Sequence, residues 1–206
     1  RWLWLACAPG LHAGQLQEWL AQGASPLDLT RETHSALAAI GLGQPAIRAL
    51  LEPDGAGIES DRRWLHAAAN RKLVTWGSAE YPPLLAQIPD APLVLYVAGD
   101  PMALCLPQLA IVGSRNPTAL GRDTATQFAQ HLAQAGLVIT SGLALGIDAA
   151  AHRGALSADA RTVAVVGRGL DAIYPRENAA LAQEILDRQG ALVTDLAVGT
   201  PPMKQN

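Results

Sequence analysis

Cysteine is scarce in this sequence. The 206 residues include only Cys7 and Cys105, both in apolar surroundings and without the spacing of metal ligands. Two such cysteines favour buried free thiols in a cytoplasmic protein over a disulfide framework. The 5 histidines also form no cluster with each other or with cysteine. The sequence therefore predicts no metal site, and it carries no pattern that calls for a cofactor.

Long apolar runs are also lacking. No stretch approaches the roughly 20 residues that a helix needs to cross a bilayer, and the N-terminus does not have the layout of a signal peptide. Apolar residues nevertheless make up 50% of the chain, which is enough to bury a substantial core. We therefore expect a globular protein without a membrane partner.

An excess of positive charge is missing too. The formal net charge is −3, so the whole surface gives no sign of nucleic-acid binding, and any polyanion must be held by a local pocket. Of 15 basic residues only Lys72 and Lys204 are lysines. The remainder are arginines, whose guanidinium groups suit bidentate phosphate contacts better than ammonium groups do.

Three similar units dominate the second half of the chain. A short apolar run ends in a glycine-containing loop and is followed by helical sequence in residues 109–135, 137–156 and 162–189, and residues 191–194 give a fourth run. Such alternation predicts an α/β fold with a Rossmann-like parallel sheet buried on both faces. Since the carboxyl ends of parallel strands share one edge, we expect the loops to converge on one crevice.

The first half is different in character. Residues 1–70 read as short helices separated by turns, including a loop at 53–57 and a helix from Ile58 to Arg71, which indicates a compact helical module. Short strands at 73–76 and 93–97 are expected to extend the sheet at its edge. We therefore divide the chain into a helical module, 1–70, and a sheet domain, 71–206.

The glycine loops are candidate phosphate-binding sites. Glycine lets the backbone approach a ligand closely, and the start of the following helix offers free N–H groups to an anion. The glycines of any single loop could serve only a tight turn, but three such loops at one edge favour binding. The candidate residues are Gly113, Ser114, Arg115, Ser141, Gly142, Gly146, Gly167, Arg168, Gly169, Arg176 and Asn178.

Catalytic readings are weaker. The first loop lacks the G-x-G-x-x-G spacing, and the second strand ends in Thr140-Ser141-Gly142 rather than an acidic residue, which disfavours NAD binding. Asp148 and His152 lie four residues apart on one helix and could form a base-orienting pair. A carboxylate at the helix N-terminus beside a packed imidazole is the favoured reading. With no nucleophile elbow, the sequence predicts a protein that is not an enzyme.

These loops resemble those of the DNA-processing protein A (DprA/Smf) family of bacterial single-stranded DNA-binding proteins. The likeness runs through residues 110–115, 141–152, 169–178 and 199–202, and upstream through 81–85 and 93–100. It implies a SAM-like helical module followed by an extended Rossmann-like domain. It also implies that Ser114, Arg115, the Ser141–Gly142 loop and Arg176 contact the DNA.

The resemblance further implies a role and partners. Members protect incoming single-stranded DNA and help load the RecA recombinase in natural transformation, without established catalysis. The full-length proteins form homodimers through a later part of the sheet domain. We expect that later part, with its arginine-rich segment, to be missing after Asn206, so that the domain is truncated at its C-terminal end and dimerisation of this chain is in question.

Two other readings stay open. A nucleotide-cleaving phosphoribohydrolase of the lysine-decarboxylase-like superfamily is the alternative, although its Pro-Gly-Gly-x-Gly-Thr motif and downstream glutamate do not occur here. An interaction scaffold whose loops hold no ligand is the third. Arg168, between two glycines where the DprA/Smf pattern has a small or uncharged residue, either adds a phosphate contact or alters the pocket.

Overall fold

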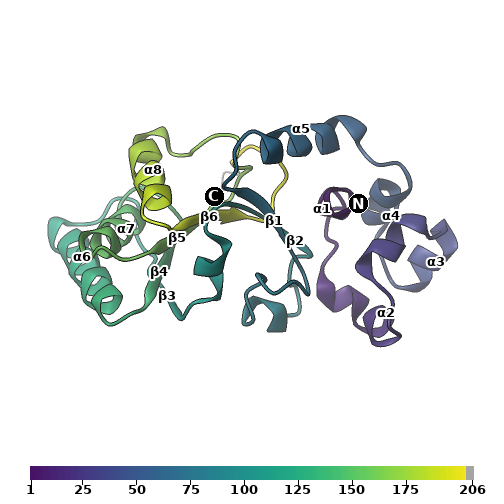
Figure 1. Cartoon of the computed structure of the whole chain (residues 1–206), viewed down its shortest axis with the longest axis horizontal. Coiled ribbons are helices and arrows are strands. Elements are labelled where there is room, and N and C mark those ends of the chain that lie inside the picture. The colour runs from purple at the N-terminus through teal and green to yellow at the C-terminus, as the bar shows by residue number, and fades with distance from the viewer. Residues whose placement is uncertain (203–206) are drawn as a thin grey trace.

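The computed structural model describes residues 1–202, so the last part of the predicted sheet domain, 203–206, lies outside the described residues. From Trp2 to His66 the regular elements are short helices joined by turns (Figure 1). The elements are α1 (Trp2–Ala6), η1 (Ala13–Leu16), α2 (Gln17–Ala21), η2 (Pro26–Arg31), α3 (His34–Ala39), α4 (Gln44–Leu51) and α5 (Gly55–His66). Side-chain caps explain several starts: the hydroxyls of Ser25 and Thr33 and the carboxylate of Asp54 each accept a backbone N–H of the helix that follows.

The prediction for the last of these helices was wrong at both ends. Asp54 starts α5 three residues earlier than expected, because its carboxylate accepts the N–H of Ala56 at 3.1 Å. The helix ends at His66, and Arg71, expected at its end, is the first residue of a strand. Four residues between them let the chain turn back toward the sheet.

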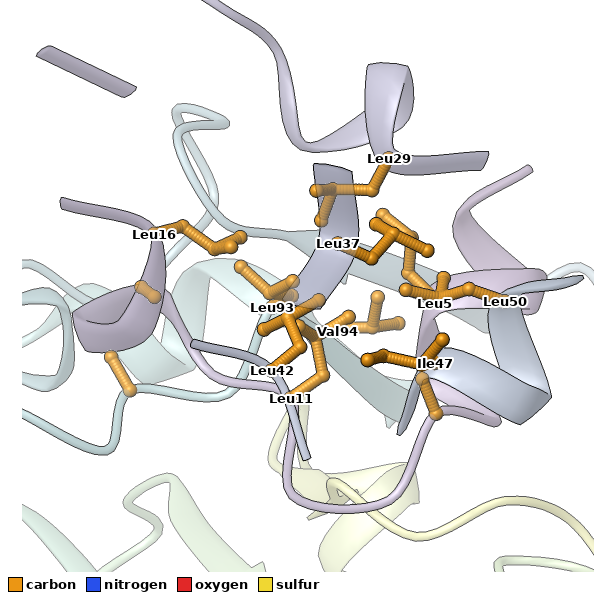
Figure 2. Close-up of a cluster of buried hydrophobic side chains, with 13 residues drawn as sticks. Leu5, Leu11, Leu16, Leu29, Leu37, Leu42, Ile47, Leu50, Leu93 and Val94 are labelled. Carbon is orange, nitrogen blue, oxygen red and sulfur yellow. The ribbon is translucent and has the colours of Figure 1, made fainter. Parts of the chain in front are cut away.

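Leucines from the helical elements form a shared core. Leu5, Leu16, Leu29 and Leu37 are at most 2% exposed. Figure 2 shows them gathered around Leu93 and Val94, at the start of a sheet strand. The helical elements therefore pack against the sheet as well as against each other.

The sheet has six strands in the order β1-β2-β6-β5-β4-β3. These are β1 (Arg71–Thr75), β2 (Val94–Gly99), β3 (Gln108–Ala110), β4 (Val138–Ser141), β5 (Thr162–Val165) and β6 (Ala191–Thr194). Strands β3 to β6 are parallel, whereas β2 pairs antiparallel with both β6 and β1. The α/β fold, the parallel core and the two added strands are thus confirmed.

Helices cover one face of the parallel strands. The connections are α6 (Ala119–Gln134), α7 (Ile147–Ser157) and α8 (Ala179–Asp187), the last preceded by η5 (Arg176–Asn178). Because the four strands lie in chain order, right-handed crossovers place all three helices on the same face (Figure 1). Ala164 and Leu192 point into the core beneath α8. The opposite face packs against Tyr81, near η3 (Leu85–Gln87), and against η4 (Pro101–Cys105).

The expectation that both faces are buried fails at β3. Leu109 is 38% exposed and Val112, just beyond the strand, is 73% exposed. The physical reason is position: β3 is the last strand of the sheet and pairs only with β4 among the described residues. Apolar side chains that a central strand would bury therefore face outward here.

Candidate nucleic-acid interface

Loops that follow all four parallel strands meet at one edge of the sheet. They enclose a cavity of about 380 Å³. Its lining residues are Arg115, Gly142, Ala144, Leu145, Asp148, Val165, Val166, Gly167, Arg168, Tyr174, Pro175, Leu196 and Pro202. The predicted crevice thus exists, and four predicted site residues, Arg115, Gly142, Gly167 and Arg168, line it.

The loop after β4 is clamped from both sides. Asp148 accepts hydrogen bonds from the N–H groups of Gly142 at 3.1 Å and Ala144 at 3.4 Å. The side-chain amide of Asn178 donates to the carbonyl oxygens of Leu143 at 2.8 Å and Ala144 at 3.1 Å. Leu143 is fully buried with φ 59°, a conformation that needs such external support. The N–H groups of Gly142 and Ala144 are consequently occupied within the protein.

The loop after β3 packs against the start of α7. The N–H of Ile147 donates to the carbonyl oxygen of Ser114 at 3.1 Å. Gly146 has φ +84°, and a side chain there would collide with that same carbonyl oxygen. A side chain at Gly113 would collide with Ile147. Both glycines therefore permit the close approach of the two loops, while Ser114 stays exposed and its hydroxyl accepts the N–H of Asn116 at 3.0 Å.

The loop after β5 carries Arg168. The guanidinium lies 3.5 Å from the carboxylate of Asp171, and its Nε donates to the carbonyl oxygen of Gly169 at 3.2 Å. Gly169 is buried, and its N–H donates to the carbonyl oxygen of Thr200 at 3.0 Å. Gly167, in contrast, is exposed and has open space where a side chain would be. Arg168 thus lines the cavity in a fixed, partly neutralised state.

Two predicted arginines are exposed and lack ion-pair partners within residues 1–202. Arg115 lines the cavity. Arg176 is also exposed and directly follows the lining residue Pro175, but it is not itself part of the lining. The ring of Tyr174 is 57% exposed at the cavity wall. These side chains are free to meet an anionic ligand.

Ser141 and Asn178 have supporting positions rather than open ones. Ser141 is 3% exposed, and its hydroxyl donates to the carbonyl oxygen of Ile111 at 2.6 Å, which joins the ends of β4 and β3. Asn178 is 2% exposed behind the loop that it clamps. Among the predicted site residues, these two and Gly169 shape the cavity from behind its wall.

Free backbone donors remain in two of the loops. Within residues 1–202, the N–H groups of Ser114, Arg115, Gly167 and Arg168 have no hydrogen-bond acceptor. Free backbone N–H groups next to arginine are the usual chemistry of a phosphate site. The arrangement therefore has free hydrogen-bond donors and positive charge at its surface.

Asp148 and His152 do not act as a pair. His152 is 0% exposed, and its Nδ1 lies 2.7 Å from the hydroxyl of Thr162. That hydroxyl donates to the carbonyl oxygen of Ile139, so it accepts the Nδ1–H proton of the imidazole. Burial lowers the pKa of His152 from 6.5 to about 4. The imidazole is packed in the core, as the favoured reading held, and the described residues contain no group of side chains that could hold a metal ion.

Sequence reasoning did not place the segment after β6 among the candidate site residues. Leu196 and Pro202 come from this segment and close one side of the cavity. The available signal was the fourth apolar run, which ends at the same edge as the other three. The loop-clamping role of Asp148 was also missed, because a carboxylate in a first helical turn has a sufficient local explanation.

Comparison with known proteins shows which family this chain resembles. Residues 72–206 match the family described as DNA recombination-mediator protein A. The chain belongs to this family. Protein Smf from Escherichia coli (strain K12) is 42% identical over 149 residues, which are 72% of this chain and 40% of that protein. The DNA processing protein DprA from Bacillus subtilis (strain 168) is 38% identical over 128 residues, 62% of this chain and 43% of that protein.

Solved structures agree with the family fold. DNA processing protein A from Streptococcus pneumoniae has a TM-score of 0.74 at 30% identity and covers 98% of this chain and 68% of its own. The Helicobacter pylori protein, described for its unique single-stranded DNA binding mode, has a TM-score of 0.56 at 33% identity over 65% of this chain and 60% of its own. The DprA/Smf resemblance is thereby confirmed. This chain spans 40% of the E. coli relative and 43% of the B. subtilis one.

Proposed function

We propose that this member of the DNA recombination-mediator protein A family binds single-stranded DNA at the cavity formed by the loops after β3, β4, β5 and β6. One observation carries the proposal: Arg115 and Arg168 line this cavity, and the two loops that carry them hold four backbone N–H groups without acceptors within residues 1–202. Such groups recognise phosphate, and a cavity of about 380 Å³ between loops admits one sugar-phosphate chain more easily than a rigid duplex.

A salt titration tests this proposal. Binding of a fluorescent oligothymidylate is followed by anisotropy at several salt concentrations, with a duplex of equal length as the competitor. If phosphate contacts dominate binding, the logarithm of the association constant, log K, should fall with the logarithm of the salt concentration. The expected slope is about −0.7 per neutralised phosphate on single strands. A duplex that competes as well as the single strand, or affinity without salt dependence, would reject the proposal.

We propose binding without catalysis. The alternative, a nucleotide-cleaving phosphoribohydrolase, needs an accessible acid or base in the cavity. Asp148 lines the cavity, but its carboxylate is occupied by two backbone N–H groups, and His152 is inaccessible. Release of free base from AMP or a cytokinin-type nucleotide, lost in Asp148→Asn, would establish the alternative.

The biological role is proposed from family membership. We propose that the longer protein protects incoming single-stranded DNA in the cytoplasm and helps load the RecA recombinase during natural transformation, with residues 1–70 as a SAM-like module. Loading is tested by RecA filament formation on DNA already covered by this protein. In the part of the chain that the structure describes, no helix is long and apolar enough to span a membrane.

Dimerisation is proposed for the full-length protein. In this chain, β3 leaves one strand edge unpaired among the described residues, beside an apolar hollow of about 300 Å³ that includes Leu109 and Phe128. Unpaired apolar strand edges favour association. Analytical sedimentation of this chain and of the full-length protein at matched concentrations compares their oligomeric states. A dimer of this chain would support association through β3, whereas a dimer of the full-length protein alone would indicate association through other segments.

A further inference from the structure

Helix α5 holds one wall of the cavity without lining it. Asp61, on this helix, is 0% exposed. Its Oδ1 accepts the N–H of Val198 at 2.8 Å, and its Oδ2 accepts the hydroxyl of Tyr96 at 2.6 Å. Val198 belongs to the segment after β6 that also carries the lining residue Leu196. One buried carboxylate thus joins α5, β2 and a cavity loop.

Trp64, one turn further along α5, reaches a second loop. Its indole N–H donates to the carbonyl oxygen of Leu170 at 3.1 Å. The indole packs edge-on against the ring of Tyr96, with centroids 6.1 Å apart, and the guanidinium of Arg71 lies 4.9 Å from its centroid. Because Trp64 is only 6% exposed and held on two sides, its N–H is a fixed anchor for the loop that carries Arg168.

The two loops are also bonded to each other. The N–H of Gly169 donates to the carbonyl oxygen of Thr200 at 3.0 Å, and the N–H of Gly199 donates to Asp171 Oδ1 at 2.8 Å. The other oxygen of Asp171 lies 3.5 Å from the Arg168 guanidinium. A continuous set of polar contacts therefore runs from Asp61, through the segment after β6, to Arg168.

We propose that Asp61 and Trp64 are positioning residues for single-stranded DNA binding, which hold the loops after β5 and β6 so that Arg168 lines the cavity. The inference rests on the function proposed above. A side chain that must meet a phosphate with little reorganisation benefits from a fixed backbone. The consequence is that α5, at the end of the predicted helical module, contributes to DNA affinity without touching DNA.

Four single variants test the proposal. Asp61→Ala removes the acceptor for the Val198 N–H, and Trp64→Phe removes the donor to Leu170; each should weaken oligothymidylate binding on the order of fivefold. Asp61→Asn keeps an acceptor and should restore affinity to within about twofold. His66→Gln, at an exposed position of the same helix, is the matched control and should leave DNA affinity unchanged. Wild-type affinity in both Asp61→Ala and Trp64→Phe would overturn the proposal.

A double variant separates positioning from general destabilisation. If Asp61 acts through Arg168, then Asp61→Ala should have almost no further effect on DNA affinity in an Arg168→Ala background, because residues joined by one network of polar contacts are energetically coupled. An equal loss in both backgrounds would contradict the mechanism. Leu37→Ala, in the helical core far along the chain from these loops, should lower Tm without weakening binding.

Amide hydrogen exchange gives a readout that needs no DNA. Asp61→Ala should speed exchange in residues 167–171 and 197–200 but not in the separately clamped loop 142–144. Should the wild-type protein fail to bind DNA, the proposed function falls while exchange still decides the positioning claim. Unchanged exchange in both loops would refute the claim.

Discussion

The side-chain amide of Asn178 lies 2.8 Å from the carbonyl oxygen of Leu143 and donates a hydrogen bond to it. The two residues are 35 positions apart: Leu143 lies in the loop that follows β4, and Asn178 is the last residue of η5. Asp148 holds the N–H groups of the same loop. The loop therefore keeps its left-handed residue Leu143 buried because two side chains satisfy its backbone.

Replacing Asn178 should release this loop. Asn178→Ala leaves the buried carbonyl oxygen of Leu143 without a partner, which costs about 1–3 kcal/mol of the free energy of unfolding. Urea denaturation measures this loss. Gln183→Ala, an exposed amide on α8, is the control and should change stability by less than about 0.5 kcal/mol. Equal stability of the two variants would contradict the clamp.

The exposed arginines should carry the salt dependence of binding. Arg115→Ala and Arg176→Ala should each weaken binding to every sequence and flatten the slope of log K against log salt by somewhat less than about one unit, because each removes one phosphate contact. Arg153→Ala, an exposed arginine on α7, makes the same charge change away from the cavity and should leave the slope unchanged. Wild-type slopes in both Arg115→Ala and Arg176→Ala would count against phosphate binding.

Stacking should be a minor contribution. Among the described residues, Tyr174 is the only aromatic one in the cavity lining, so Tyr174→Ala should cost less than the roughly 1–3 kcal/mol typical of a stacked base. Equilibrium titration at one salt concentration suffices for this measurement. If this variant loses most of the affinity while the arginine variants keep theirs, a stacking surface must replace the phosphate pocket.

His152 should make the protein sensitive to mild acid. Its folded-state pKa of about 4 lies below its ordinary value of 6.5 because burial disfavours the charged imidazole. As pH falls, His152 is therefore protonated in the unfolded chain before it is protonated in the folded protein. The contribution of neutral His152 to the free energy of unfolding is complete above pH 6.5. It is lost as pH falls toward 4, and the total loss reaches about 3 kcal/mol.

Comparison with a non-titrating variant isolates this effect. The free energy of unfolding of the wild-type protein should fall between pH 6.5 and 5, whereas that of His152→Gln should fall less over the same range. Parallel curves would show that His152 does not titrate as its burial implies.

Much of the sheet could be predicted because its signal is local. Apolar runs located β4, β5 and β6, and helical patterns located α6, α7 and α8 to within a few residues. The exposure of β3 could not be predicted in this way. An apolar run reads the same whether the strand is central or at an edge, and only the strand order decides which it is.

The candidate site was likewise predicted only in part. Loop composition identified Arg115, Gly142, Gly167 and Arg168, which do line the cavity, because parallel strands must place such loops at one edge. Composition could not tell an available group from an occupied one. Ser141 and the N–H of Gly142 are used inside the protein, since their partners, Ile111 and Asp148, meet them only after folding.

The sequence by itself determined the α/β class, the shared edge of the glycine loops and the family resemblance, because each depends on residues within one strand-loop-helix unit. The tertiary structure alone decided which backbone groups stay free for a ligand. It also decided that Asp61 and Trp64 of α5 hold loops more than one hundred residues later in the chain. Such contacts arise from packing between distant segments, for which a local pattern carries no signal.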